Sequence, residues 1–298
     1  MIGRLLTAMV TPFTADDQVA LEEAGRLAKW LLKEGNDGVV IAGTTGEAPT
    51  LSVEEKLALF EAVVEAAGSS GSIIANTGGN DTRSSVALTK RATEAGVSGI
   101  LAVVPYYNKP TQEGLILHFS ALAEATHLPI ILYNIPSRTG IEMQPETMLT
   151  LAQRYPHIVG VKESSGNFAQ FSAILRERQP AFKLWSGDDG LFLPTLALGA
   201  DGLISVAGHL CARELRELLD AYHAGDVQRA AALHLQLTPL FAGLFCVSNP
   251  TPVKWALAKL GVAVGGVRAP LAPLPLAQEP HLAALIEPYR TRFQAWLS

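Results

Sequence analysis

The sequence predicts an α/β protein, a (β/α)8 TIM barrel with a C-terminal helical appendage. Two observations favour this fold. Short apolar runs alternate about eight times with segments of helical periodicity, and the runs are apolar throughout, which indicates parallel strands buried on both faces. No GxGxxG motif follows the first run, so the strongest sign of an open dinucleotide-binding sheet is missing from the sequence.

The predicted strands share a simple pattern, in which an apolar run ends in Gly, Thr, Asn, Pro or another polar residue. They are Leu5–Pro12, Gly38–Gly43, Ile73–Thr77, Ile100–Pro105, Ile130–Asn134, Ile158–Lys162, Phe182–Gly187 and Gly202–Val206. About eight units in a row fit a closed barrel better than an open doubly wound sheet.

Between these runs, apolar residues recur at helical spacing. Val53, Leu57, Phe60, Val64 and Ala67 form one stripe, because they are separated by four, three, four and three residues. Shorter stripes run from Ala24 to Leu31 and from Leu115 to Leu122. Each stripe predicts a helix that packs on the sheet.

Several helix ends are marked by their capping residues. Ser52 precedes Glu54 and Glu55 in a capping-box pattern, and Asp81 leads the next helix in the same way. Gly35, Gly68 and Gly96 stand where helices are expected to end, since a left-handed cap favours glycine.

The predicted barrel and its catalytic site occupy residues 1–223, and a helical region occupies residues 224–298. Helices are expected at Val227–Phe245, Val253–Leu260 and His281–Trp296. The segment 249–252 and the proline-rich stretch 270–280 interrupt them, and we expect the latter to be an ordered loop. The appendage is expected to cover barrel surface or to support subunit contacts.

Composition excludes several classes of partner. The chain has 298 residues, with 23 Lys and Arg against 28 Asp and Glu, and no basic cluster that would suit nucleic acid. Two cysteines cannot form a disulfide framework, and the seven histidines show no ligand spacing, so we expect neither a metal nor another cofactor. The apolar run at Leu5–Val10 is too short for a signal sequence or a membrane span, and we expect a cytoplasmic protein that contacts no membrane.

Polar residues collect where the predicted strands end. In a barrel of this class the carboxyl ends of the strands surround the active site. The segments at these ends are Thr44–Glu47, Tyr106–Asn108, Tyr133-Asn134, Arg138–Gly140, Lys162–Ser165 and Gly187–Asp189.

Lys162 is the most informative of these residues, because it follows the apolar strand Ile158–Val161. A lysine in an apolar core loses hydration of its charged form, which favours a neutral amine that can attack a carbonyl. The alternative is a structural charge that neutralises Glu163 or a bound anion.

Hydroxyl groups near that amine suit proton transfer. Tyr133 is placed to move a proton on and off a carbinolamine oxygen, and Thr44 and Tyr107 could extend a hydroxyl chain to water. The alternative for Tyr133 is an aromatic residue that covers the barrel core.

Two features suit carboxylates. The turn at Thr44–Gly46 offers backbone N–H groups and hydroxyls, and Arg138 offers a planar fork. An ordinary turn and a solvated arginine are the alternatives. Asp188 and Asp189 argue against a phosphorylated substrate, and we expect them to cap a helix or to accept backbone N–H groups.

Seven segments together resemble the dihydrodipicolinate synthase (4-hydroxy-tetrahydrodipicolinate synthase) family of pyruvate-dependent class I aldolases, over essentially the whole chain. They are Gly43–Glu47, Pro105–Asn108 with Gln112–Gly114, Tyr133–Gly140, Gly160–Glu163, Ser186–Asp189, Gly202–Val206 and Asn249–Lys254. Arg138 favours this family over the related neuraminate and sugar-acid lyases, because those lyases usually lack that arginine.

The resemblance implies a lyase that condenses pyruvate with L-aspartate 4-semialdehyde, in lysine biosynthesis via diaminopimelate. It implies that Lys162 forms a Schiff base and that Tyr133, Thr44 and Tyr107 relay protons, with Tyr107 supplied by a neighbouring subunit. Its substrate-binding residues would be Thr45 and Ile204 at the pyruvate carboxylate, Arg138 at the semialdehyde carboxylate, and Gly187. The usual assembly is a homotetramer, a dimer of dimers.

This sequence departs from the family pattern in two places. Gly208-His209 stands where asparagine is common, and we interpret this as a change in loop packing beside the site. Lysine-inhibited members bind lysine near the positions of Ala48, Val53, Lys56, Asn80, Ser84 and Tyr106. Ser84 supplies no carboxylate for an ammonium, so we expect weak inhibition by lysine or none.

Two other functions are compatible with parts of this pattern. One is a pyruvate-dependent aldolase or dehydratase of the same superfamily that acts on a 2-oxo-3-deoxy sugar acid or a hydroxy-oxoglutarate. Arg138 and the pair Tyr106-Tyr107 favour the synthase over it. The other is a catalytically silent barrel, which the intact set of Lys162 and its hydroxyl neighbours disfavours.

Overall fold

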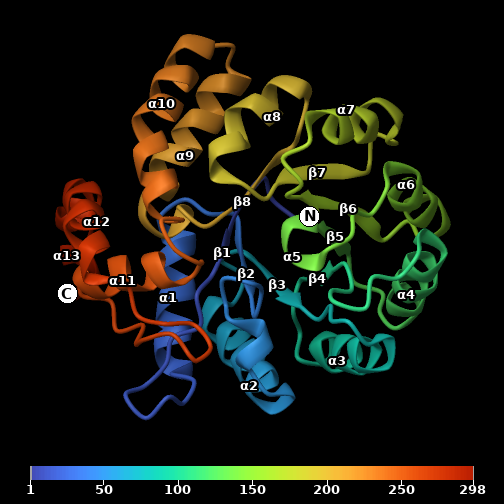
Figure 1. Ribbon diagram of the computed structural model, residues 1–298, viewed down its shortest axis with the longest axis horizontal. Coiled ribbons are helices and arrows are strands. Elements are labelled where there is room, and N and C mark those ends of the chain that lie inside the picture. Colours follow the sequence, from blue (N-terminus) through green and yellow to red (C-terminus); the bar gives the residue numbers. More distant parts are fainter. Residues whose placement is uncertain (1, 298) are drawn as a thin grey trace.

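The structure is a computed structural model that describes residues 2–297. Within them, eight parallel strands close a barrel in chain order, with β1 paired to both β2 and β8 (Figure 1). The strands are β1 Leu5–Ala8, β2 Gly38–Ile41, β3 Ser72–Asn76, β4 Gly99–Val103, β5 Ile130–Asn134, β6 Ile158–Glu163, β7 Lys183–Ser186 and β8 Gly202–Ser205. The predicted fold class is confirmed.

Helices form an outer ring around this barrel (Figure 1). They are α1 Leu21–Lys33, α2 Val53–Ala67, α3 Thr82–Glu94, α4 Gln112–Glu124, α6 Pro145–Arg154, α7 Phe168–Glu177, α8 Phe192–Leu198 and α9 Gly208–His223. A further one-turn helix, α5 Pro136–Thr139, follows β5. The three stripes of apolar residues at helical spacing correspond to α1, α2 and α4, so these three predictions are confirmed.

The capping residues act as expected. The Ser52 side chain accepts the backbone N–H of Glu55, whose carboxylate accepts the backbone N–H of Ser52. Asp81 accepts the backbone N–H of Ser84 at the start of α3. Gly68 takes a positive φ at the end of α2, a conformation that costs glycine little.

Some predicted strands are longer than the observed ones. The run Leu5–Pro12 forms a strand only to Ala8, after which the chain crosses the barrel end as a loop. Pro12 has no N–H to donate to a ladder, which is one reason the strand cannot include it. Phe13 then pairs with Val19 in an isolated antiparallel bridge.

The apolar residues form two layers of core. A large cluster lies between barrel and helices, and a smaller one fills the barrel interior. The interior cluster consists of Leu6, Ala8, Val40, Ile74, Leu101, Ile131, Tyr133, Trp185 and Ile204. Because successive side chains of a strand point to opposite faces, each strand contributes to both layers.

The C-terminal region consists of α10 Val227–Gly243, α11 Thr251–Lys259, α12 Glu279–Ile286 and α13 Arg290–Leu297. It lies on one side of the barrel, next to α9 and α1 in Figure 1. The single helix expected at His281–Trp296 is wrong, because a 3-10 turn at Glu287–Tyr289 separates α12 from α13. Pro288, which lacks an N–H, stands in that turn.

In the described part of the chain, no helix combines the length and the apolar character that crossing a bilayer requires.

Candidate active site

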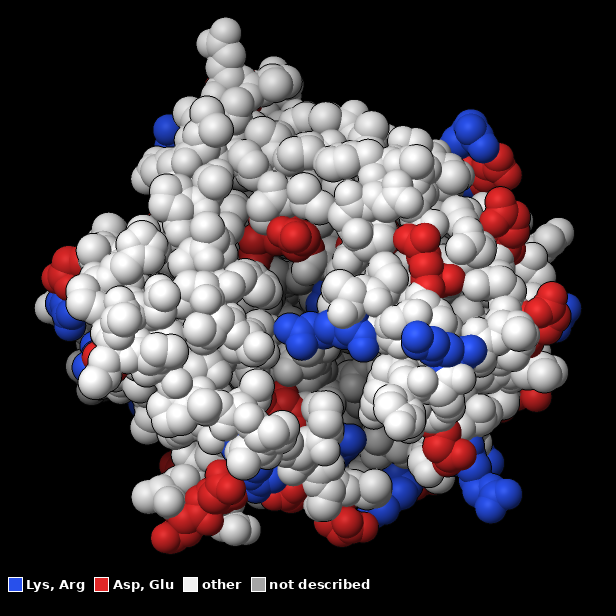
Figure 2. Space-filling view, in the orientation of Figure 1, with Lys and Arg blue, Asp and Glu red and all other residues white. Residues whose placement is uncertain are grey.

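A cavity of about 400 Å³ opens at the carboxyl ends of the strands. Figure 2 shows the hollow near the centre of this face, with basic side chains beside it. Its wall includes Thr44, Lys56, Asn76, Thr77, Asn80, Asp81, Ser84, Tyr106, Tyr133 and Arg138. The site therefore lies where barrels of this class place their chemistry.

Lys162 lies inside the barrel beside this cavity. It is paired in register with Tyr133 across β5 and β6, and its side chain is only 5% exposed. Its Nζ lies 4.3 Å from the centre of the Tyr133 ring. Tyr133 in turn lines the cavity. The amine of Lys162 thus lies over the face of the Tyr133 ring.

Glu163 does not serve as the partner of Lys162. It lies on the opposite face of β6, where its carboxylate accepts hydrogen bonds from Asn134, Gln170 and the backbone N–H of Ser165. Burial raises the pKa of Glu163, against the effect of these donors. The interpretation of Lys162 as a counter-charge for Glu163 is therefore wrong.

Thr44 and Arg138 share the cavity with Tyr133. Thr44 belongs to the turn after β2. Arg138 is carried by α5, which Pro136 begins and Gly140 ends with a φ of 76°. The sequence thus places a cation and two hydroxyls in one space, which suits a polar, anionic substrate.

Three other predicted residues are not part of the cavity wall. Ile204 belongs to the interior core of the barrel, and Thr45 is buried in the turn after β2. Gly187 lies directly against Lys162, since a Cβ there would overlap Ser164 and come within 2.9 Å of Lys162 Cε. A side chain at Gly187 would displace the amine.

Tyr107 is the predicted residue that lies apart. Its side chain is 89% exposed, its φ is +75°, and it is not part of the cavity wall. Positive φ is rare for a bulky residue and is commonly kept for a functional reason. Tyr106, next to it, does line the cavity.

The aspartates after β7 behave as expected. Asp188 accepts the backbone N–H of Gly190. Asp189 is buried and accepts the hydroxyl of Ser205 and the backbone N–H groups of Val206 and Ala207. Burial raises the pKa of Asp189. This carboxylate fixes the end of β8, directly after Ile204.

His209 lies in the first turn of α9, not in a loop, and it packs against the loops that follow β1 and β8. Its Nε2 accepts the backbone N–H of Val10, and its Nδ1 bonds the carbonyl of Val206, which requires the Nδ1–H tautomer. Burial lowers the pKa of His209 to about 4. The ring is a neutral link between β1 and β8.

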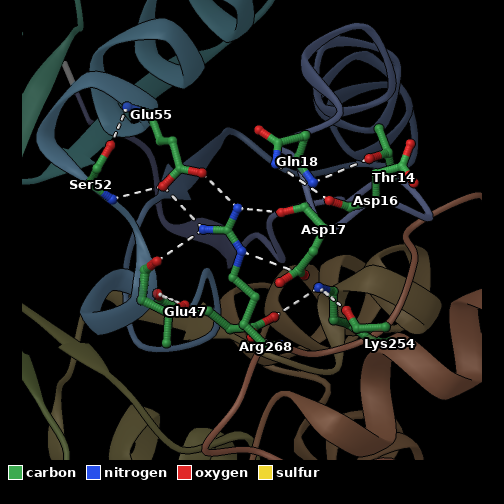
Figure 3. A network of polar contacts seen from close by, with 11 residues as sticks. Thr14, Asp16, Asp17, Gln18, Glu47, Ser52, Glu55, Lys254 and Arg268 are labelled. Carbon is green, nitrogen blue, oxygen red and sulfur yellow. Dashed lines mark hydrogen bonds and ion pairs between the residues drawn. The ribbon is translucent and has the colours of Figure 1, made fainter.

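A buried polar network holds the turn that carries Thr44 and Thr45 (Figure 3). Glu47, in a left-handed conformation with φ 56°, accepts Lys254 Nζ at 2.8 Å and the backbone N–H of Arg268 at 2.9 Å. Burial lowers the pKa of Lys254 to about 8, although Glu47 opposes this effect. Arg268 also pairs with Glu55 at the start of α2.

Two groups of site residues were not predicted. Asn76 ends β3 and Thr77 follows it, and both line the cavity. Their position at the end of an apolar run was a signal that the sequence contained. Asn249 donates to Thr45 across 204 residues, a contact that no local pattern indicates. Among residues 2–297, no three His, Cys, Asp or Glu side chains gather as metal ligands would.

Known proteins resemble this chain over nearly all of its length. Residues 1–288 match the model of the dihydrodipicolinate synthetase family. The 4-hydroxy-tetrahydrodipicolinate synthase of Symbiobacterium thermophilum is 53% identical over 95% of this chain and 97% of its own. That of Moorella thermoacetica is 52% identical over 96% and 97%.

Solved structures agree with these relatives. The dihydrodipicolinate synthase of Bacillus anthracis has a TM-score of 0.94 and 41% identity, and covers 96% of this chain and 99% of its own. The enzyme from Cyanidioschyzon merolae, solved with lysine bound, has a TM-score of 0.94 and 43% identity, and covers 95% and 97%. With a full-length family match, close relatives and the same barrel, this chain belongs to the dihydrodipicolinate synthetase family.

Proposed function

We propose that this chain condenses pyruvate with L-aspartate 4-semialdehyde to 4-hydroxy-tetrahydrodipicolinate through a Schiff base on Lys162. One observation carries the proposal, namely the buried amine of Lys162 in contact with Tyr133 beside a cavity that also holds Thr44 and Arg138. The names of the relatives support the choice of reaction.

The chemistry begins with addition of Lys162 Nζ to the C2 carbonyl of pyruvate. A proton moves to the carbinolamine oxygen, water leaves, and the imine forms. Loss of a methyl proton gives an enamine, whose C3 attacks the aldehyde carbon of the semialdehyde. The amino group of that substrate then adds to C2 and expels Lys162 as the ring closes.

Proton transfer is assigned to Tyr133, with Thr44 and Tyr107 extending the relay. A positioned acid–base group contributes about 10²–10⁴-fold in rate, so we expect a loss of that size for Tyr133→Phe. The contact between the Tyr133 ring and Lys162 Nζ supports this role.

Substrate binding is assigned to groups around the amine. Thr45 and Ile204 would take the pyruvate carboxylate, and Gly187 leaves room beside Lys162. Arg138 would hold the semialdehyde carboxylate bidentately. Its place in the cavity wall supports that role.

Tyr107 is proposed to act in the site of a neighbouring subunit, within a homotetramer built as a dimer of dimers. The exposure of its side chain outside its own cavity supports this. The proposal also places the enzyme in the cytoplasm and in lysine biosynthesis via diaminopimelate, as the family resemblance implies.

Subunit complementation tests the role of Tyr107. Tyr107→Phe and Lys162→Ala are each expected to lose most activity. A refolded mixture should regain part of it, because a hybrid contains one site with both groups. If the mixture stays as inactive as its parents, Tyr107 does not act across subunits.

Reductive trapping tests the function itself. The protein is incubated with pyruvate and borohydride, and the mass increase is mapped by peptide. We expect the adduct on Lys162 and not on Lys254, the other buried lysine, and none in Lys162→Ala. An adduct elsewhere, or none, would overturn the mechanism.

A coupled assay with dihydrodipicolinate reductase tests the second substrate. Trapping at Lys162 with activity only on a 2-oxo-3-deoxy sugar acid or hydroxy-oxoglutarate would favour the related aldolase.

A further inference from the structure

We infer that Asn249 is a positioning residue for the pyruvate site, which it serves by orienting the hydroxyl of Thr45. This inference rests on the proposed function. The Asn249 Nδ2 group donates to Thr45 Oγ1 at 2.9 Å, and the two residues are 6% and 3% exposed. The bond joins the segment between α10 and α11 to the turn after β2, so it is a tertiary contact and not a turn of the local chain.

The direction of this hydrogen bond decides what Thr45 can do. A threonine hydroxyl has one proton to donate and two lone pairs that accept. Since the amide of Asn249 donates, the hydroxyl accepts, and its own proton is not used in this bond. Thr45 makes no other side-chain hydrogen bond within residues 2–297. Its proton is therefore left for a carboxylate acceptor.

The other amide atom of Asn249 supports the same interpretation. Its Oδ1 is buried and has no hydrogen-bond partner among the described residues. An unmade bond at a buried acceptor costs about 1–3 kcal/mol. Within the described residues, the donor bond to Thr45 is thus the one side-chain hydrogen bond that Asn249 makes.

The surroundings hold both partners in place. On the side of Thr45, Glu47 is fixed by Lys254 and by the backbone of Arg268, and Gly46 accepts a bond from Thr11. Lys254 belongs to α11, the helix that begins two residues after Asn249. Figure 3 shows Glu47, Lys254 and Arg268 in one network of polar contacts. The segment that contains Asn249 and Lys254 therefore both fixes the turn after β2 and orients the Thr45 hydroxyl in that turn.

The test uses Asn249→Leu in the full-length protein, because leucine keeps the shape of the side chain and removes both amide atoms. We expect the KM for pyruvate to rise at least about 3-fold, the size of one ordinary hydrogen bond. The KM for the semialdehyde should change less. The melting temperature should fall less than in Asn36→Leu, because Asn249→Leu removes one hydrogen bond together with an unpaired oxygen, whereas Asn36→Leu removes two bonds. Asn249→Ala, which adds no new bulk, should raise the pyruvate KM similarly and serves if the leucine variant does not fold.

Asn36 provides a matched control. It is also buried and also bonded to a threonine, but it stands before β2 at the opposite end of the barrel, and both of its amide atoms have partners, Thr7 and Leu31. Asn36→Leu should give the reverse pattern, with the larger fall in melting temperature and an unchanged KM for pyruvate.

A double-variant cycle tests whether Asn249 acts through Thr45. In the Thr45→Val background, Asn249→Leu should raise the pyruvate KM no further. The inference would be overturned if Asn249→Leu left the pyruvate KM unchanged. It would also be overturned if the fold-changes in pyruvate KM of the two substitutions multiplied in the double variant. Borohydride trapping separates this failure from that of the proposed function, because the latter fails only if the unaltered protein forms no adduct at Lys162.

Discussion

Lys162 and Glu163 are neighbours in β6, yet their side chains enter different environments. Successive residues of a strand point to opposite faces, so Lys162 enters the barrel and Glu163 enters the layer beneath the helices. Asn134 and Gln170 satisfy the carboxylate there. The lysine consequently has no salt bridge to its neighbour and faces Tyr133 instead.

Gly187 sets the space around this amine. We expect Gly187→Ala to reduce kcat/KM for pyruvate by at least about 10-fold, because overlap with Ser164 and Lys162 Cε must move the side chain that reacts. Gly266→Ala is the control, since no atom lies within 4 Å of the added Cβ. Steady-state kinetics check both, and equal activity of the two variants would contradict the prediction.

His209 makes stability dependent on pH. Its pKa is about 4 in the fold against an ordinary value of 6.5, so the unfolded chain binds the extra proton between these values. The contribution of His209 to the free energy of unfolding is therefore complete above pH 6.5. It is lost as the pH drops toward 4, and the total loss is about 3 kcal/mol. Burial lowers the pKa of His118 to about 4 as well, so protonation of His118 also reduces stability as the pH falls.

Denaturant unfolding between pH 7 and pH 4.5 checks this contribution. His209→Gln keeps a donor and an acceptor but cannot titrate, so its stability should fall less steeply with acidification than that of the unaltered protein. His223→Gln changes an exposed histidine at the end of the same helix and should keep the original slope. Parallel slopes for all three proteins would contradict the assignment.

At the scale of elements, α2 and α3 shape the outer part of the cavity. Val53, Lys56 and Ser84 lie in its wall, and burial lowers the pKa of Lys56. The carboxylate in the same wall is Asp81, which already accepts the backbone N–H of Ser84. An incoming ammonium would thus meet the cationic Lys56, and the carboxylate in this wall, Asp81, already has one oxygen bonded to the backbone N–H of Ser84.

We therefore expect no half-maximal inhibition by L-lysine at sub-millimolar concentration. Ser84→Glu adds a carboxylate and should increase sensitivity to lysine, whereas Ser84→Gln adds the same bulk without charge and should not. Initial rates measured against lysine concentration check all three proteins. Sub-millimolar inhibition of the unaltered enzyme would contradict this interpretation of the cavity.

At the scale of the whole molecule, the C-terminal region is tied to the barrel by charge as well as by apolar contact. Leu237, Val253 and Leu282 belong to the same core cluster as the barrel strands. Lys254 and Glu47 form an ion pair whose side chains are 2% and 1% exposed. Removal of one partner leaves the other charge buried, which costs far more than the pair itself contributes.

Lys254→Met is expected to lower the free energy of unfolding by about 3–5 kcal/mol. Adding Glu47→Gln to it should restore part of this loss, because the uncompensated carboxylate is then removed. Lys259→Met, an exposed position in the same helix, should change stability by less than about 1 kcal/mol. Losses that simply add in the double variant would contradict coupling between the two residues.

Much of the fold followed from local patterns in the chain. Apolar runs located every strand of the barrel, and Ser52, Asp81 and the glycines at helix ends marked boundaries correctly. The break at Pro288 was available in the same way but was missed, because apolar residues continue at helical spacing across it. For the site, a polar residue after a buried strand was enough to single out Lys162 and Tyr133.

What the sequence determined by itself was the order of strands and helices and the residues at each strand end, since periodicity and capping act between residues a few positions apart. Only the tertiary structure decided which of those residues meet. Pairing of β5 with β6 brings Tyr133 to Lys162, and the C-terminal region brings Asn249 to Thr45 and Lys254 to Glu47. Such contacts depend on how the whole chain packs, and their energies come from burial that no short segment can provide.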